Sequence, residues 1–557
     1  MLWNLAFLAL PAVTARQVSI QVDVGQSMGP YVPTARFFGA DEPDYAFYPD
    51  GSATLNDLGH LGPHQTYFRT HNLLTTGNGL ETTLKFGSTN IYTEDAEGNP
   101  IYNYTVVDRI FDSYLKNNVK PYVQAGFMPE ALAINPLPYF FNFTPTSAYN
   151  DIYTGWSHPP KSYEKWGELI YQWAKHCLER YGLEEVNSWY WEIWNEPNIP
   201  YWNGTIPQFY KLHDYAVNGI RRAIPTARVG GAEVAGGPSG DYLGNFIEHC
   251  LDGTNYATGE KGTPLDFVSF HAKGAPNYIN TSSTSGYVQM GIAAQLQNVN
   301  DAFKVIASYP QTKSKPIVVG EQDPDGCAAC ITPQYGYRNG LLYPSFIAAG
   351  FTRTMDLSKK YGVNHQGSLT WAFEYDHDEY FSGFRVVTTN RIDKPVLNAH
   401  RMLVKMTGTR VKAISSGQQP LEDVVTNGVR NATDVGAISS VDGDKAYVFI
   451  WHYHDDDLPK PDAEIDVAVE GLSWNGNARL THYRLDNEHS NSYTKWMSMG
   501  SPQNPTAEQH AELRAAGLLA TLGKPTALNV EGGCAKVSLS LPIHALSLLV
   551  IEKEDSN

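Results

Sequence analysis

Residues 189–197 read Trp-Tyr-Trp-Glu-Ile-Trp-Asn-Glu-Pro, and this stretch decides how the chain is expected to fold. Aromatic and β-branched residues alternate with polar ones up to Asn195 and Glu196, where a proline ends the pattern. The pattern is typical of a buried strand that presents an amide and a carboxyl group at its C-terminal end. A second apolar run, over residues 315–321, also ends on a glutamate, Glu321. The sequence therefore predicts two strands that each deliver a carboxyl group.

Strand and helix patterns alternate on both sides of these stretches. Apolar runs predict eight strands, over residues 36–40, 66–71, 120–126, 188–195, 228–233, 265–271, 316–321 and 368–374. Apolar residues recur three to four positions apart, as in helices, over residues 162–181, 207–223, 289–306 and 338–360. This alternation predicts an α/β fold, a (β/α)₈ TIM barrel over residues 35–404. A doubly wound open sheet is the main alternative, but no Gly-x-Gly-x-x-Gly turn follows an early strand.

The rest of the chain has strand patterns. They dominate residues 405–557, with one helix-like insert over residues 506–519, and this region is predicted to be a β-sandwich domain. Residues 16–34 contain an alternating apolar run and precede the first barrel strand. Because such a strand needs a partner, we expect it to join the β-sandwich.

Residues 1–15 form a short apolar stretch that ends in the small-residue pattern Val-Thr-Ala. We interpret it as a signal peptide of a protein secreted to the extracellular space. A buried N-terminal helix is the alternative, but Pro11 disfavours it. Asn-x-Ser/Thr sequons, which fit a secreted glycoprotein, stand at Asn103, Asn142, Asn203, Asn280 and Asn431.

Charge and composition narrow the expected partners. The formal net charge is −17 and no basic run interrupts it, so nucleic acid is not an expected partner, because phosphate binding needs clustered lysines and arginines. After the first residues no stretch is apolar enough to span a membrane, and no membrane partner is expected. Aromatic residues make up 12% of the chain, which suits carbohydrate surfaces, although a large aromatic core explains it slightly better.

The five cysteines include one Cys-x-x-Cys, at Cys327 and Cys330, just after Glu321. A four-ligand zinc site would need a second pair, and a redox motif would need a thioredoxin-like context. We therefore predict a local disulfide that braces the loop after Glu321. Residues 376–379 and 452–457 are rich in histidine and acids but lack a recognised ligand spacing, so no metal site is predicted.

In a (β/α)₈ barrel the active site lies at the C-terminal ends of the strands, where Glu196 ends the fourth and Glu321 the seventh. Two carboxyl groups in such places are what glycosidic-bond cleavage needs: one protonates the leaving oxygen, and the other attacks or activates water. In retaining enzymes the two groups are about 5–5.5 Å apart. This chemistry needs no metal or organic cofactor. For either glutamate alone, the plainer interpretation is a surface carboxylate at a strand end.

The motif over residues 194–197, with a glutamate at the seventh strand, resembles the retaining barrel glycosidases of glycoside hydrolase clan A. Within the clan the chain looks like family 39, which includes β-xylosidases and α-L-iduronidases. Several stretches look more like the iduronidases: residues 69–71, 249–255, 265–275, 321–324, 394–396 and 505–509. The resemblance covers residues 60 to 550, most of the chain.

This resemblance implies that Glu196 is the acid/base and Glu321 the nucleophile of a double displacement. It also implies a set of substrate-binding residues: His71, Asn195, His271, Lys273, Trp371, Asp378 and Arg385. Each histidine could equally be a satisfied barrel-lining residue, and the tryptophan a core residue. The amide of Asn195 corresponds to one that bonds a sugar 2-hydroxyl.

The glycone is predicted from two cations. Lys273 and Arg385 would suit the C5 carboxylate of a uronic acid, since charge-assisted bonds discriminate against a ligand without it. Ala272, where an arginine is expected, and residues 37–43 depart from the iduronidase pattern. The sequence thus favours a secreted, retaining, iduronidase-like exo-glycosidase acting on an oligosaccharide or glycoside. The alternatives are a β-xylosidase of neutral plant pentosides and a non-catalytic carbohydrate-binding barrel.

Overall fold

The computed structural model describes residues 16–77, 88–139, 154–283, 285–327, 330–371, 376 and 378–554. The predicted signal peptide, the sequon at Asn142 and the end of the predicted eighth strand after Trp371 lie outside these residues. No helix in the described part of the chain combines the length and apolarity needed to cross a bilayer.

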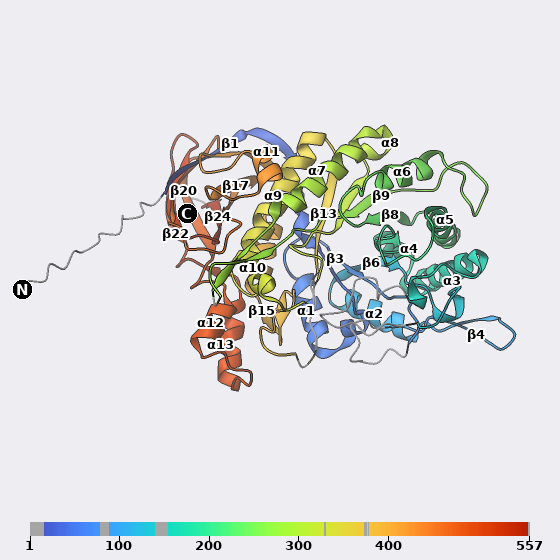
Figure 1. Cartoon of the computed structure of the whole chain (residues 1–557). Coiled ribbons are helices and arrows are strands. Elements are labelled where there is room, and N and C mark those ends of the chain that lie inside the picture. The colour runs from blue at the N-terminus through green and yellow to red at the C-terminus, as the bar shows by residue number, and fades with distance from the viewer. Residues whose placement is uncertain are drawn as a thin grey trace, which may run out of the picture.

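Eight parallel strands close into a barrel, and they match the eight predicted strands (Figure 1). In barrel order they are β2 (Phe37–Ala40), β3 (Thr66–Thr70), β6 (Val119–Ala125), β7 (Tyr190–Ile193), β8 (Arg228–Val234), β9 (Phe267–His271), β12 (Pro316–Glu321) and β13 (Asn364–Trp371). Pairing of β13 with β2, Leu369 opposite Phe37, closes the ring. The predicted TIM barrel is therefore confirmed.

Helices cover the outside of the barrel and carry the predicted apolar periodicity. The main ones are α1 (Pro49–Gly59), α2 (Thr105–Lys116), α3 (Tyr163–Tyr181), α5 (Ile206–Ala223), α6 (Tyr242–Asp252), α7 (Ile292–Ser308), α9 (Leu342–Tyr361) and α10 (Pro395–Lys405), with the short α4 (Leu183–Asn187) and α8 (Pro310–Lys313). α5 begins with a capping box, in which Thr205 accepts from the Gln208 amide and the Gln208 side chain bonds back to the cap. α3 and α5 pack against each other, each burying a stripe of residues three to four apart.

Two layers fill the barrel interior. The lower layer is aromatic and includes Tyr67 on β3 and Tyr190 on β7, whose ring centroids are 5.0 Å apart. Side chains two residues further along a strand point to the same side, so the next inward positions on these strands are Arg69 and Glu192. Both are fully buried and paired. The aromatic layer therefore supports a charged layer directly beneath the barrel mouth.

The other strands form one ten-stranded mixed sheet: β1 (Arg16–Pro30), β16 (Thr409–Ser415), β17 (Asp434–Asp442), β18 (Lys445–Tyr453), β19 (Ala463–Glu470), β20 (Gly476–Leu485), β21 (Ala520–Thr521), β22 (Thr526–Val530), β23 (Ala535–Leu541) and β24 (Leu546–Lys553). β1 pairs with β16 antiparallel and with β19 parallel, so the N-terminal strand joins the C-terminal sheet as predicted. Figure 1 shows this blue strand among the orange and red ones. Apolar residues of β1, β19 and β23 share one buried cluster with those of β18, β20 and β24, as in a two-layered sandwich.

Smaller elements complete the fold. Short strand pairs are β4 (Tyr92–Glu94) with β5 (Pro100–Tyr102), β10 (Asn277–Asn280) with β11 (Gly286–Gln289), and β14 (Thr388–Thr389) with β15 (Ile392–Asp393). The predicted insert is α13 (Ala507–Gly517), and α11 (Leu421–Asn427) and α12 (Ser492–Ser498) were not predicted.

Buried polar contacts join the sheet and the barrel. Arg353 on α9 pairs with Asp434 at 2.7 Å, and the Asp455 carboxylate accepts from the backbone amides of Ile292 and Val429. Asp455, from the acidic stretch 452–457, thus serves the domain interface.

Candidate active site

A cavity of about 620 Å³ opens where the barrel strands end. Seven of the nine predicted site residues line it: His71, Asn195, Glu196, Lys273, Glu321, Trp371 and Arg385. Tyr201, Tyr335 and the backbone around Gly236 complete much of the wall. The volume is in the range of small-molecule sites.

An unusual backbone path brings Glu196 to the cavity. After β7 ends at Ile193, Trp194 and Glu196 adopt positive φ angles of 71° and 43°, which are uncommon for residues other than glycine. The amide of Glu196 donates to the carbonyl oxygen of Glu233 at 3.0 Å, and the Trp194 amide donates to the Ala125 carbonyl at the same distance. The flanking strands β6 and β8 therefore hold the turn that presents Glu196.

His271, at the end of β9, lies behind Glu196 and does not line the cavity. Its Nδ1 is 2.8 Å from Glu196 Oε1, and its Nε2 is 2.6 Å from Glu233 Oε2. Burial alone would lower the pKa of this imidazole, but the charge of Glu321 and the contacts with Glu196 and Glu233 raise it to about 9. At neutral pH His271 is therefore an imidazolium that donates one N–H to each glutamate.

Glu321, the last residue of β12, lies among cations. Lys273 Nζ is 2.7 Å from its Oε2, Arg69 Nη1 is 3.1 Å from its Oε1, and His71 Nε2 is 3.5 Å from the same oxygen. Burial would raise the pKa of this carboxyl, but His271, Lys273, His71 and Arg69 together hold it well below the usual range. Glu321 is therefore ionised.

The two glutamates are close. Glu196, His271 and Glu321 each place one nitrogen or oxygen within 4.8 Å of the others. This separation fits the short spacing of retaining glycosidases rather than the roughly 6.5–9.5 Å of inverting ones. The same three atoms could surround a metal ion, but an imidazolium offers N–H groups rather than a lone pair, so the donor set suits protons better.

Arg69 is the hub of the charged layer. Its guanidinium contacts Glu192, reaches Glu321 and donates through Nη2 to the Asn195 side-chain oxygen at 2.9 Å. This bond fixes the orientation of the Asn195 amide, whose nitrogen has no hydrogen-bond partner among the described residues. A donor so oriented can bond a sugar hydroxyl.

Lys273 and Arg385 share a carboxylate. Lys273 Nζ is 2.7 Å from Asp323 Oδ2, and Arg385 Nη1 is 2.5 Å from Asp323 Oδ1. Arg385 Nε also lies 3.6 Å from Asp325 Oδ2. Burial would lower the pKa of Lys273, but Asp323 and Glu321 raise it. Both cations are therefore charged, and carboxylates of the protein already balance them.

Two further predicted residues form one wall. His71 Nδ1 is 2.8 Å from Asp41 Oδ1, and its ring lies 4.9 Å from the ring of Trp371. Trp371 also covers the guanidinium of Arg69 at 5.9 Å. A Cβ on Gly39 would come within 2.5 Å of the Trp371 ring, so only glycine admits the indole here.

The structure does not bring Asp378 into this group. Its carboxylate accepts from the Glu379 amide at 2.9 Å and the Ser382 hydroxyl at 2.8 Å, and it does not line the cavity. These bonds lie within its own loop after β13. Asp323, two residues after Glu321, is the acid that meets Arg385 instead.

Arg69, Glu233 and Asp323 were not assigned roles from the sequence. Glu233 had a usable signal, since it ends the predicted strand 228–233 as Glu196 and Glu321 end theirs. Arg69 is a charged residue inside the predicted buried strand 66–71, and a buried arginine needs an ion-pair partner.

Comparisons with known proteins identify the family of the chain and agree with its fold. Residues 64–528 match the family model described as glycosyl hydrolases family 39. A β-xylosidase of Caldicellulosiruptor saccharolyticus is 27% identical over 74% of this chain and 76% of its own length, and the α-L-iduronidase of Mus musculus is 25% identical over 91% and 77%. Among solved structures, a monomeric β-xylosidase from Caulobacter crescentus CB15 superimposes with a TM-score of 0.73 at 20% identity, covering 97% of this chain and all of that one. A bacterial orthologue of human α-L-iduronidase also gives 0.73, at 18% identity, covering 98% and 85%.

Proposed function

The chain belongs to glycosyl hydrolases family 39 and is a retaining glycoside hydrolase, and on this premise we propose that Glu321 is its nucleophile and Glu196 its acid/base. The observation that carries the assignment is the difference in charge around two close carboxyl groups. Glu321 has Lys273 and Arg69 at hydrogen-bond distance, whereas Glu196 contacts only His271 among the charged side chains of the described residues.

In the first step a carboxylate oxygen of Glu321 attacks the anomeric carbon of the bound glycoside. The bond to the leaving oxygen breaks, and Glu196 gives that oxygen its proton. In the second step Glu196 takes a proton from water, the water oxygen bonds to the anomeric carbon, and the ester to Glu321 breaks. Two displacements return the original anomeric configuration.

His271 supports both states of Glu196. Its Nδ1–H donates to Glu196 Oε1, so the catalytic proton belongs on Oε2. Once that proton has left, the Glu196 carboxylate faces an imidazolium. Hydrogen bonds to ionised groups are shorter and stronger than neutral ones, so this contact strengthens as charge develops.

The ion pairs favour a neutral glycone, such as the pentoside of a β-xylosidase, over the uronide expected from the sequence. Lys273 and Arg385 were assigned to a sugar carboxylate, but Glu321, Asp323 and Asp325 already balance them. A uronide would add a negative charge to a balanced cluster.

A uronide remains the second candidate for one reason. Lys273 and Arg385 line the cavity, and Lys273 loses an anionic partner when Glu321 becomes an ester. A sugar carboxylate could replace that partner in the intermediate.

Nitrophenyl glycosides with one common aglycone test both proposals. We expect kcat/KM on β-D-xyloside to exceed that on β-D-glucuronide and α-L-iduronide by at least about tenfold, the discrimination expected of a single unmatched charge. NMR should show the retained anomer first. A preference for a uronide would select the second candidate, and no turnover of any glycoside would leave a carbohydrate-binding protein.

We also propose that the protein is secreted after cleavage behind Ala15. The apolar residues 1–15 support this, as does a disulfide between Cys327 and Cys330, since disulfides persist in oxidising compartments. The test is N-terminal sequencing of protein from the culture medium, which should begin at Arg16. An intact Met1 on intracellular protein would contradict the proposal.

A further inference from the structure

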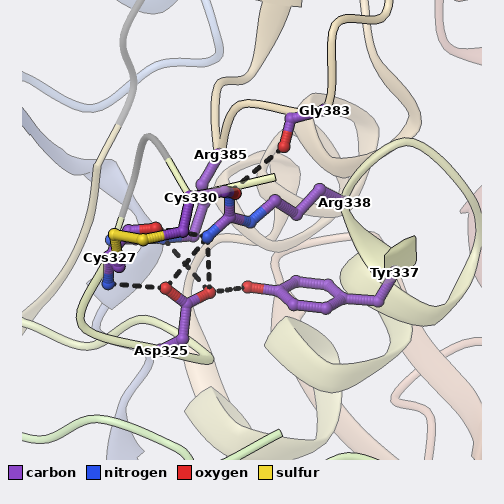
Figure 2. The surroundings of a disulfide bond; sticks show 7 residues. All are labelled: Asp325, Cys327, Cys330, Tyr337, Arg338, Gly383 and Arg385. Carbon is purple, nitrogen blue, oxygen red and sulfur yellow. Dashed lines mark hydrogen bonds and ion pairs between the residues drawn. A yellow bond between two sulfur atoms is a disulfide. The ribbon is translucent and has the colours of Figure 1, made fainter. Parts of the chain in front are cut away.

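A chain of alternating charges leads from the predicted disulfide to Glu321. The Cys327–Cys330 disulfide is present, and Figure 2 shows the outer half of this ion-pair chain beside it. Its members, in order from the disulfide, are Arg338, Asp325, Arg385, Asp323, Lys273 and Glu321. Three cations alternate with three anions.

At the disulfide end of the ion-pair chain, backbone groups hold the charged side chains. The carbonyl oxygens of Cys327 and Cys330 both accept from the Arg338 guanidinium, the latter at 2.5 Å. The Cys327 amide donates to Asp325 Oδ1 at 2.7 Å. Because the S–S bond joins residues only three apart, it keeps these carbonyls and this amide together as one receptor for an Arg–Asp pair.

That pair is buried and closely held. Arg338 and Asp325 are 1% and 3% exposed, and Arg338 Nη2 lies 3.0 and 3.1 Å from the two carboxylate oxygens. The Tyr337 hydroxyl also donates to Asp325, and the Gly383 carbonyl accepts from Arg338 at 3.1 Å. A buried charge needs its partner, so neither side chain can leave without exposing the other unpaired.

The inner end of the ion-pair chain reaches the cavity. Arg385 lies between Asp325 and Asp323, and the second oxygen of Asp323 holds Lys273 against Glu321. Arg338 does not line the cavity, but its guanidinium lies 4.3 Å from the ring of Tyr335, which does. Arg338 can thus act on the site only through the residues it holds.

We propose that the Cys327–Cys330 disulfide and Arg338 are positioning elements for the reaction. They fix Asp325, Asp325 fixes Arg385 at the cavity wall, and Asp323 passes this placement on to Lys273. The inference rests on the proposed role of Glu321 and deepens it. It assigns to the loop that carries the disulfide, whose Gly326 and Cys327 line the cavity, control over how the glycone ring is held and how Lys273 is placed against Glu321.

The consequences for kinetics are specific. If the receptor for Arg338 is lost, Arg385 and Lys273 gain freedom, so substrate binding weakens more than the chemical step. Lys273 also contacts Glu321 less often, and the pKa of Glu321 then rises toward its ordinary value. The acid limb of kcat/KM should therefore move to higher pH.

The experiment compares three variants of the whole chain: Cys327→Ser with Cys330→Ser, Arg338→Met, and Arg338→Lys. In the first two we expect kcat/KM on nitrophenyl β-D-xyloside to fall about 10- to 100-fold, the scale of a 1 Å misplacement, mainly through KM. Both should show the acid-limb shift. Arg338→Lys should recover part of each effect, because it keeps the charge but lacks the planar fork that reaches several carbonyl oxygens at once.

Two control variants separate positioning from general loss of stability. Arg353→Met removes a buried arginine–aspartate pair of similar burial at the domain interface, and Cys534→Ser removes a free thiol in the sheet. Arg353→Met should lower the melting temperature without moving KM or the acid limb of kcat/KM. Cys534→Ser should change none of the three. Folded disulfide and Arg338 variants with wild-type KM and acid limb would overturn the proposal.

Crystal structures of the wild type and the double serine variant supply a readout that needs no turnover. Displacement of Arg385 and Lys273 in the variant supports the positioning role, even if the wild type cleaved no glycoside and the proposed function failed. Arg385 and Lys273 unmoved in the variant would overturn the proposal, whatever the enzyme's activity.

Discussion

The surroundings of Glu321 and Glu196 differ more than their positions do. Both residues stand at the C-terminal ends of strands of one barrel, yet Lys273, Arg69 and the His271 imidazolium lie around Glu321, whereas Glu196 pairs with His271 alone in the described part of the chain. Identical side chains thus lie in different electrostatic surroundings, as in other paired-carboxylate enzymes. Substitutions of the two glutamates and of the charged residues that contact them should therefore have different effects.

The largest expected effect is that of Glu321→Ala. Without a nucleophile the double displacement cannot begin, and kcat should fall by at least about 10⁴-fold, as when a covalent catalyst is removed. The loss should be similar for good and poor leaving groups. Added azide should restore turnover and give the inverted glycosyl azide, which NMR would identify. Activity near the wild-type level would reject the assignment.

Glu196→Ala should differ from Glu321→Ala, because its loss of activity should depend on the leaving group. General acid catalysis contributes roughly 10²–10⁴-fold, so xylobiose should lose about this much. Nitrophenyl xyloside needs little protonation of its leaving oxygen, and its first step should suffer far less. Steady-state and burst kinetics on both substrates measure the contrast. Equal losses on the two substrates would remove the distinction between the glutamates.

Lys273→Ala sharpens the comparison, because it removes a cation that contacts Glu321 but not Glu196. The pKa of Glu321 should rise, and the acid limb of kcat/KM should move to higher pH. Loss of a hydrogen bond to a charged group should lower kcat/KM by roughly one to two decades. The loss of kcat/KM is measured on a xyloside, a glucuronide and an iduronide that share one aglycone. Similar losses on all three support the neutral-glycone proposal, and a loss confined to the uronides contradicts it.

His271, shared by both glutamates, predicts a dependence of stability on pH. Its pKa is about 9 in the folded protein against an ordinary 6.5. Its contribution to the free energy of unfolding is therefore complete below pH 6.5 and is lost as pH rises through 9. The free energy of unfolding should fall by about 3 kcal/mol across this window from this group. Urea unfolding of the wild type and His271→Gln on either side of the window tests this. Parallel pH profiles would mean that His271 is neutral in the fold.

Asp378→Asn should have the smallest effect. Its carboxylate bonds within its own loop, away from both glutamates, so kcat/KM should change less than about twofold, as for most substitutions outside a site. A loss of tenfold or more on any substrate would return Asp378 to the substrate-binding residues.

The eight barrel strands were predictable because short strand-like segments alternate with helical periodicity, and Glu196 and Glu321 were predictable because each ends such a segment. The pairing of charges was not. Lys273 and Arg385 read as free cations in the sequence, since nothing there shows that Asp323 lies between them or that Asp325 contacts Arg385. Such pairs depend on how loops after different strands meet, and local patterns carry no information on that distance. α12 was missed for a related reason, as tertiary packing rather than periodicity decides so short a helix.

The place of β1 has a consequence for how the nascent chain matures. This strand leaves the ribosome before the barrel, yet it lies between β16 and β19, so one of its edges stays unpaired until residue 415 has been made and the other until residue 470. The intervening barrel can close meanwhile, because its eight strands pair only with one another. Since β1 leads almost directly into β2, a closed barrel tethers it near the point where its partners will emerge. Barrel closure thereby shortens the effective loop, and lowers the entropic cost, of joining the two ends of the sheet.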